Sequence, residues 1–383
     1  MLSLSGEIRR KKTEQRSGQQ QGKPKGAFHR DRSFPEDELL LHADPGAAVK
    51  LCENGRETLR GCLRVGIVFK AMKSIFTRLL SALPVVWLVV SLVFLLIHLV
   101  PGDPVQQMLG DSATAADLAR LRHQYGLDQP LWAQYLHYWR NVLHGNFGQS
   151  MRLHDSVLHL ILTRYPYTLA LTFCALAVAV LLAVPAGVLA AVRRGGFVDQ
   201  TIGLISLTGL SVPAFALAPL LILLFSIHLG WLPVSGAGDG SLWLPQNWPY
   251  LILPSFGMGA SLAAILTRVV RSSMLEELNQ DYVRTARAKG LSERRVVYGH
   301  ALRNALVPVV TVLGLQFGAL LAGAIVTETI FSWPGLGRLV VAAISARDYA
   351  LVQGSLLCIG LSYVAVNLLT DIAYRWMDPR MRS

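Results

Sequence analysis

Six long apolar runs constrain this chain more than any other feature of its sequence. The runs are residues 79–100, 167–192, 201–230, 250–267, 305–327 and 350–370, and none of them contains Asp, Glu, Lys or Arg. Each reaches the ~18 residues or more that a helix needs to cross the ~30 Å hydrocarbon core of a bilayer. Soluble domains carry about 25% charged residues, whereas this chain of 383 residues carries 16%. The sequence therefore predicts an all-α integral membrane protein with six transmembrane helices.

Prolines near the middle of the second and third runs are expected to disturb their helices. The third run is longer than one span and contains Pro213 and Pro219, and the second run contains Pro185. Proline removes a backbone donor and clashes with the preceding helical turn. We therefore expect the third span to be kinked or broken, and the second to bend more mildly.

The basic residues of the loops collect on one side if the six spans alternate in direction. That side has Lys70, Lys73 and Arg78 before the first span, Arg193 and Arg194 after the second, the basic segment 268–304 after the fourth, and Arg375, Arg380 and Arg382 after the sixth. The other side has no Lys or Arg in residues 231–249, and only Arg338 and Arg347, offset by Glu328 and Asp348, between the last two spans. Cytoplasmic loops are enriched in Lys and Arg, so both termini are expected in the cytoplasm. The net charge of +12 is then explained by orientation, and no nucleic-acid partner is expected.

The first outer loop, residues 101–166, is long enough to form an extracytoplasmic helical insertion between spans 1 and 2. Apolar residues at helical spacing predict one helix over 114–125, ending before Gly126, and a second that begins at Pro130 and ends near Gly145. The second helix is aromatic and amphipathic, as are helices that lie at a membrane surface. It could lie there, cap the outer mouth of a pore, or simply form a packed hairpin with the first.

Residues 1–71 have the composition of a chain too polar to fold. They contain 14 Lys or Arg and 9 Asp or Glu, with many Gln and Gly and few aromatic residues. We expect a disordered basic tail without a cleavable leader. The segment that begins at Met72 is typical of the start of a membrane protein, so the tail could also reflect a mis-assigned start. A role in touching anionic lipid or RNA is the alternative.

The segment 268–304 is a basic block between spans 4 and 5. Good helix formers over Glu276–Lys289 are followed by Gly290, which suits the left-handed residue at the end of a helix, and Ser292 can cap a second helix over Glu293–Asn304. Basic residues outnumber acidic ones in this block, which suits either lipid head groups or an acidic groove on a protein.

The sequence contains little that indicates a catalytic site or a metal site. No G-x-x-x-x-G-K-[ST] phosphate loop is present, so the chain lacks that means of binding ATP. Ser211 and His228 could be read as an intramembrane protease, but small residues in a proline-broken span are more often hinge and packing positions. The histidines at 137, 144, 154 and 159 have no carboxylate or thiolate at a spacing that completes a metal site. A carboxylate at Glu328, at the outer edge of span 5, needs a partner, for which Arg338 is the candidate.

Four separated motifs resemble the ABC-importer permeases of the dipeptide/oligopeptide/nickel group. They are Asp281–Ser292 with His300–Pro308, Pro101-Gly-Asp-Pro104, Tyr125–Pro130, and Glu328–Arg338. The resemblance covers residues 72–383 in the same order and spacing. The loop departs from the general permease pattern, because Arg284-Thr285-Ala286 stands where Glu-Ala-Ala is usual and Leu302-Arg303 where Leu-Pro is usual.

The resemblance implies that this chain is the pore subunit of an ATP-driven importer of di- or oligopeptides in the inner membrane. ATP and Mg²⁺ would be bound by two partner ATP-binding subunits, so this chain would be neither an enzyme nor the holder of a cofactor. A second, similar permease and an extracytoplasmic solute-binding protein would complete the assembly. The residues implied in ATPase coupling are Asp281, Tyr282, Arg284, Ala286, Lys289, Gly290, Arg294, His300, Arg303 and Asn304. Those implied in the outer loop and gate are Gly102, Asp103, Pro104, Glu328, Trp333, Pro334, Gly335 and Gly337.

Two alternatives remain open. A permease of the same group could carry nickel, glutathione or another small solute. An ion-coupled secondary transporter is a different class, but no predicted span has an Asp, Glu, Lys or Arg at its middle to bind the coupling ion.

Overall fold

The computed structural model describes residues 80–95, 98–99, 114–124, 128–150, 152–240 and 244–377. All of them belong to one compact unit, Phe69–Ser383. The predicted tail 1–71 and the outer-loop residues Gly102, Asp103 and Pro104 lie outside the described residues.

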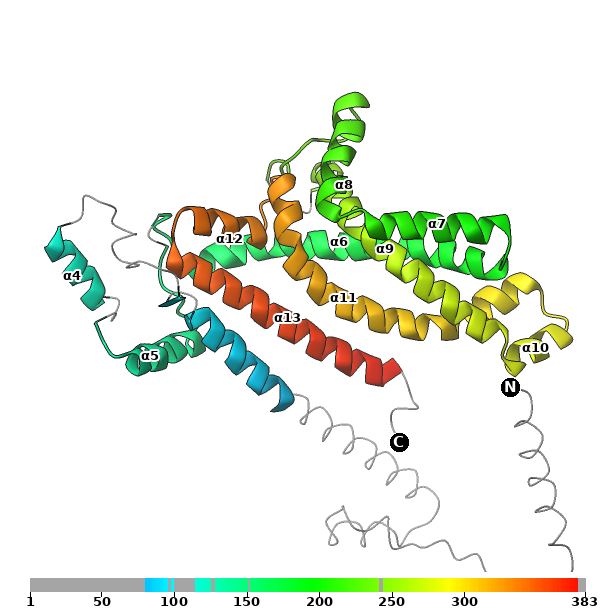
Figure 1. The fold of residues 1–383 in the computed structure, drawn as a ribbon, viewed down its shortest axis with the longest axis horizontal. Coiled ribbons are helices and arrows are strands. Elements are labelled where there is room, and N and C mark those ends of the chain that lie inside the picture. The colour runs from blue at the N-terminus through cyan, green and yellow to red at the C-terminus, as the bar shows by residue number, and fades with distance from the viewer. Residues whose placement is uncertain are drawn as a thin grey trace, which may run out of the picture. The chain divides into compact units, whose positions relative to one another are not determined.

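The described part of the chain is almost entirely helical (Figure 1). Its first helix is Leu80–Leu95. The labelled α-helices are α4 (Ala115–Gln124), α5 (Leu131–Leu143), α6 (Val157–Val192), α7 (Phe197–Ser211), α8 (Ala214–Leu221), α9 (Pro249–Leu278), α10 (Asp281–Ala288), α11 (Leu302–Ile330), α12 (Leu336–Ser345) and α13 (Tyr349–Met377). Two π-helical stretches, η3 (Ile222–His228) and η5 (Arg295–Ala301), precede a loop and α11, and η4 (Pro245–Asn247) is a 3₁₀ turn. The one β-bridge among these residues joins Gln149 to Ser156.

Four helices are long and apolar enough to cross a membrane: Val157–Val192, Pro249–Leu278, Arg295–Ile330 and Tyr349–Ile372. A fifth candidate is the pair formed by α7 and α8–η3, which bends by 101°. The bend occurs where Pro213 lacks a backbone donor, so the expected break in the third run is confirmed. The first predicted run appears as the shorter helix Leu80–Leu95, and its remainder lies partly outside the described residues. A count of six spans therefore stays a prediction.

Several helices extend beyond the apolar runs. Residues 268–278 continue α9 in place of a separate loop helix, and the residues from 293 onward run without a break through η5 into α11. The expected helix over Glu276–Lys289 is therefore divided, because its first three residues belong to α9, residues 279–280 form a turn, and α10 covers Asp281–Ala288. Pro185 lies inside α6 without ending it, as is common where neighbouring helices support the backbone.

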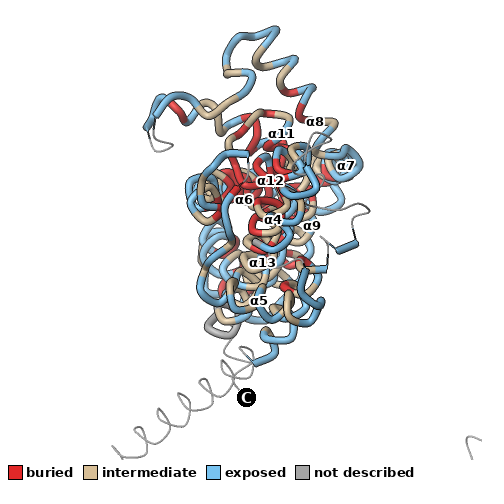
Figure 2. Tube along the Cα trace, turned by 90° about the vertical axis from the view of Figure 1, so that its left-hand side faces the viewer, coloured by how far each residue is buried: buried red, intermediate tan, exposed pale blue. Residues whose placement is uncertain are grey.

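The most extensive helix packing among the described residues is between α6 and α9, where small residues allow the backbones to approach. A side chain on Gly187 of α6 would lie 2.6 Å from Cβ of Val270, and one on Gly259 of α9 would lie 2.6 Å from the carbonyl oxygen of Ala175. Such contacts between small residues are typical of membrane helices, whose association depends on packing rather than on exclusion of water. Figure 2 shows the buried residues gathered along these central helices.

Both predicted helices of the outer loop are present. The second, α5, packs against Leu80–Leu95: the hydroxyls of Ser91 and Tyr135 are 2.7 Å apart, and Phe94 forms ring contacts with Tyr135 and Tyr138. A second stripe of α5 is exposed, with the side chains of Trp132, Leu136 and Leu143.

Candidate functional site

The helix α10 is held against the long helices by one apolar face. Val283 and Ala286 are buried in a cluster with Val270 and Met274 of α9 and Val297 of η5. The opposite face of α10 is exposed and charged. The short helix is therefore fixed to α9 and to the start of α11 while its polar face stays free within this chain.

The chain leaves α10 through a Schellman turn centred on Gly290. The N–H of Gly290 donates to the carbonyl of Arg287 at 2.9 Å, and the N–H of Leu291 donates to that of Ala286 at 3.4 Å. Gly290 has φ +76°, which only glycine adopts without strain. No atom lies within 4 Å of the position that a Cβ would occupy. The requirement for glycine inside this chain is therefore conformational and not steric.

An ion pair spans the same turn. Arg287 Nε lies 2.7 Å from Glu293 Oε1, with both side chains partly exposed. A weaker pair, Asp281 with Arg284 at 3.6 Å, is almost fully exposed and contributes little to stability. Tyr282 donates its hydroxyl to Glu277, and burial raises the pKa of Tyr282. These contacts stabilise the geometry of α10 and its turn.

Most of the residues predicted for coupling lie on the exposed surface of this loop. They are Asp281, Tyr282, Arg284, Lys289, Gly290, Arg294, His300, Arg303 and Asn304. Ala286 differs, because it is 7% exposed and contributes packing to α10. The predicted helix over Glu293–Asn304 is not a separate element, since it continues as η5 and α11. The loop is thus a short helix followed by the polar beginning of a long helix.

A second cluster surrounds Glu328 near the end of α11. Its side chain is completely buried. Oε1 accepts a 2.6 Å hydrogen bond from the hydroxyl of Thr168 on α6, and Oε2 accepts a 3.0 Å bond from the backbone N–H of Arg338 on α12. Thr168 in turn accepts the backbone N–H of Leu336 at 2.8 Å. One carboxylate therefore links α6, α11 and the first turn of α12.

The residues after α11 fit closely around this carboxylate. Trp333 is fully buried and donates from Nε1 to the carbonyl of Tyr167 at 3.0 Å. A Cβ on Gly335 would overlap the carboxylate of Glu328, and one on Gly337 would lie 2.5 Å from Cα of Ile325. Pro334 lies between Trp333 and Gly335 in the sequence and is half-buried. Glu328, Trp333, Gly335 and Gly337 are therefore brought together around one buried carboxylate.

The expected ion pair between the side chains of Glu328 and Arg338 is wrong, because the Arg338 side chain binds elsewhere. The Arg338 guanidinium donates from Nη1 to the carbonyl of Ser332 at 2.6 Å, and only the backbone N–H of Arg338 reaches Glu328. Arg338 lies in the first turn of α12, where the N–H groups of a helix lack intrahelical partners and readily bind a carboxylate. The partner of Glu328 is thus a helix N-terminus and a hydroxyl.

Two residues that pair with distant polar groups were not predicted from the sequence: Thr168, which binds Glu328, and Asp199. Thr168 carries no distinguishing pattern in an apolar run. Asp199 follows a basic turn and forms a two-point ion pair with Arg271 on α9, at 2.6 and 2.8 Å. An acidic residue beside Arg193 and Arg194 could have been noticed, but its partner is 72 residues away.

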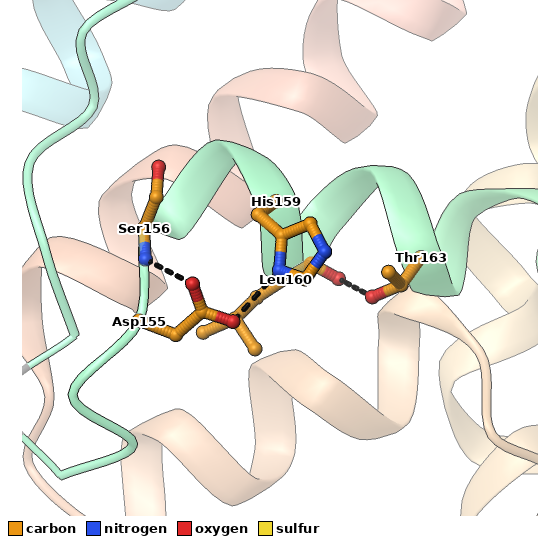
Figure 3. A network of polar contacts seen from close by, with 5 residues as sticks. All are labelled: Asp155, Ser156, His159, Leu160 and Thr163. Carbon is orange, nitrogen blue, oxygen red and sulfur yellow. Dashed lines mark hydrogen bonds and ion pairs between the residues drawn. The ribbon is translucent and has the colours of Figure 1, made fainter.

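The histidines of the outer loop do not converge on a metal site. His159 Nδ1 lies 2.7 Å from Asp155 Oδ2, and Asp155 Oδ1 accepts the backbone N–H of Ser156 (Figure 3). The hydrogen bond with His159 and that with Ser156 lower the pKa of Asp155. Over the described ranges, no group of three or more His, Cys, Asp or Glu is placed to hold a metal ion.

Nearly the whole of residues 71–383 is similar to known proteins. Residues 183–383 match the family described as binding-protein-dependent transport system inner membrane component, and residues 71–172 match its N-terminal part. The glutathione transport system permease protein GsiC of Escherichia coli (strain K12) is 44% identical over 308 residues, which cover 80% of this chain and 98% of that protein. The GsiC protein of Salmonella typhi is 45% identical over the same lengths.

Among solved structures, the inward-facing MetNI methionine ABC transporter is 18% identical, with a TM-score of 0.46 over 58% of this chain and 97% of that chain. The family match and the identity to the GsiC proteins agree with the four motifs in the sequence. This chain therefore belongs to the inner membrane components of binding-protein-dependent transport systems, as an ABC importer permease of the dipeptide/oligopeptide/nickel group.

Proposed function

We propose that this permease forms one half of the pore of an importer for short peptides, with glutathione as the first candidate. The observation that carries the proposal is the 44% identity to a glutathione permease over 98% of that protein. Glutathione is itself a short peptide, so this substrate is compatible with the expected peptide class. Nickel remains an outcome of the test, because no ligand set for it is present in the described residues.

The energy for transport would enter through α10 and the turn at Gly290. An exposed polar face on a helix that is firmly packed against α9 suits contact with a separate ATP-binding subunit. Two such subunits, a second permease and an extracytoplasmic binding protein would complete the transporter. ATP-driven closure of the two subunits would then shift the permeases between inward-open and outward-open states.

The cluster at Glu328 would form part of the external gate. It joins α6, α11 and α12 through hydrogen bonds to one buried carboxylate. With both termini cytoplasmic, the orientation predicted from the basic loops, this cluster lies toward the outer side. Because these hydrogen bonds hold the outer ends of α6, α11 and α12 together, the three ends would move as one rigid unit.

The test is uptake by the assembled transporter in proteoliposomes, with its binding protein outside and ATP inside. Radiolabelled glutathione, a dipeptide, a pentapeptide and Ni²⁺ are compared as substrates. We expect ATP-dependent uptake of glutathione that needs the binding protein. Uptake of Ni²⁺ alone would refute the peptide assignment, and uptake that persists without ATP-binding subunits would refute the assignment of an ATP-driven pore.

A further inference from the structure

The helix α7 buries few of its side chains and makes a strong polar contact near its beginning. Only Asp199 and Ser206 are buried among its 15 residues. Its apolar side chains point outward, including Phe197, Leu204, Ile205 and Leu207, which are 55–82% exposed. Figure 2 shows this helix as largely exposed. Apolar burial within this chain therefore does little to hold α7 in place.

Arg271 of α9 makes the strongest polar contact with α7. Its Nε and Nη2 donate to Oδ1 and Oδ2 of Asp199 at 2.6 and 2.8 Å, and the backbone N–H of Gly195 donates to Oδ2 at 2.9 Å. Two parallel bonds between a guanidinium and a carboxylate fix the relative orientation of the groups as well as their distance. The beginning of α7 is thereby held to the polar end of α9.

The same end of α9 also carries α10. Val270 and Met274 lie next to Arg271 along α9 and are buried in the cluster that contains Val283 and Ala286 of α10. On its other side, Val270 contacts Gly187 of α6 closely enough to exclude any larger residue there. The segment around Arg271 is therefore a junction between α6, α9 and α10 (Figure 1). A two-point ion pair ties the beginning of α7 to it.

Beyond α7, the chain turns sharply into α8. The bend is 101°, and α8 packs through Leu221 against Leu253 in the other half of α9. A displacement of α7 relative to α9 would therefore change the angle at Pro213, where no helical hydrogen bond resists bending.

We propose that Arg271 and Asp199 are positioning residues that make α7 follow α9 and α10 during transport. This inference rests on the proposed function of α10 as the site where a partner ATPase acts. The ion pair would transmit displacement of the loop to α7, and through the bend at Pro213 to α8. Without it, ATP would still be hydrolysed but α7 would not follow.

The test uses the assembled transporter in a background without cysteine, with spin labels at Leu204→Cys on α7 and Asn279→Cys at the end of α9. The distance distribution should be narrow in the parent protein and broad in Arg271→Gln and Asp199→Asn. Arg193→Gln is the matched control, because it removes one positive charge from the turn between α6 and α7. The side chain of Arg193 is exposed and makes no hydrogen bond or ion pair in the described structure. Arg271→Lys keeps the charge without the two-point geometry and should give an intermediate width.

A second measurement distinguishes positioning from a purely structural role. The amount of labelled glutathione taken up per ATP hydrolysed should fall about tenfold in Arg271→Gln, within the ~5- to 150-fold range of coupling between sites in proteins. The hydrolysis rate and co-purification with the ATP-binding subunits should be retained. If uptake and hydrolysis fall in proportion, or if the label distribution stays narrow, the inference is wrong. If no variant or parent transports peptide, the proposed substrate fails, while the label distribution still decides the role of the ion pair.

Discussion

The surroundings of Glu328 could hardly be predicted from the sequence, and the structure defines them well. Its carboxylate accepts one hydroxyl and at least one backbone N–H while completely shielded from solvent. Removing such an acceptor leaves buried donors unsatisfied, at a cost of about 1–3 kcal/mol for each.

We predict that Glu328→Ala lowers the thermal midpoint of the detergent-solubilised transporter by several degrees, whereas Glu328→Gln has a smaller effect. Glutamine keeps the volume and can still accept the N–H of Arg338 while its amide donates to Thr168. Intrinsic fluorescence during heating measures the midpoint, with the exposed residue Glu276→Ala as control. Equal midpoints for Glu328→Ala and the parent protein would contradict the bonding described for this cluster.

Substitutions at Gly290 can distinguish the effect of backbone strain from that of a side chain that would block a partner subunit. A residue with a Cβ at φ +76° costs roughly 1–2 kcal/mol, but asparagine tolerates this region better than most. The space around Gly290 is open within this chain. We predict that Gly290→Asn retains co-purification with the ATP-binding subunits, that Gly290→Ala weakens it, and that Gly290→Trp abolishes it.

The measurement is pull-down of the ATP-binding subunits with the tagged permease, followed by ATP-dependent uptake. Membrane insertion, judged by protease protection, should be unchanged in all three variants. Normal uptake in Gly290→Trp would mean that no partner approaches this turn closely.

At the scale of elements, α10 depends on packing rather than on its own helix propensity. It has only eight residues, well below the ~12–15 at which an isolated helix becomes marginal in water. Its attachment comes from Val283 and Ala286 in the apolar cluster.

We predict that Val283→Asp releases α10 while the long helices remain intact, because an unpaired buried carboxylate costs several kcal/mol. Amide hydrogen exchange over residues 281–288 should become more than about tenfold faster. Thr285→Asp places the same carboxylate on the exposed face of the same helix and should leave the protection of α10 nearly unchanged. If both variants exchange alike, the buried face of α10 has been misjudged.

At the scale of the whole molecule, the arrangement of basic loops predicts which side each loop faces. Single cysteines at Ser235, in the loop before α9, and at Lys289, after α10, test this in a background without other cysteines. We expect a membrane-impermeant maleimide to label Ser235→Cys in intact cells with a permeable outer membrane, and Lys289→Cys only after the inner membrane is opened. The reverse pattern would invert the predicted topology.

Much of the architecture followed from periodicity and composition. The apolar runs predicted the helices α6, α9, α11 and α13, Pro213 predicted the break after α7, and Gly290 predicted the end of α10. These features are local, since each depends on residues within a few turns of one another. The ends of the helices were harder to predict, because α9 and α11 continue into polar sequence where neighbouring helices support them.

By itself, the sequence determined the membrane class, the helical content, the family and the glycine turn in the basic loop. Tertiary structure alone decided the partners of the buried charges. Glu328 meets Thr168 across 160 residues, and Asp199 meets Arg271 across 72. The reason is physical: a charge removed from water is stable only beside groups that satisfy it, and packing between helices, not spacing along the chain, brings those groups together.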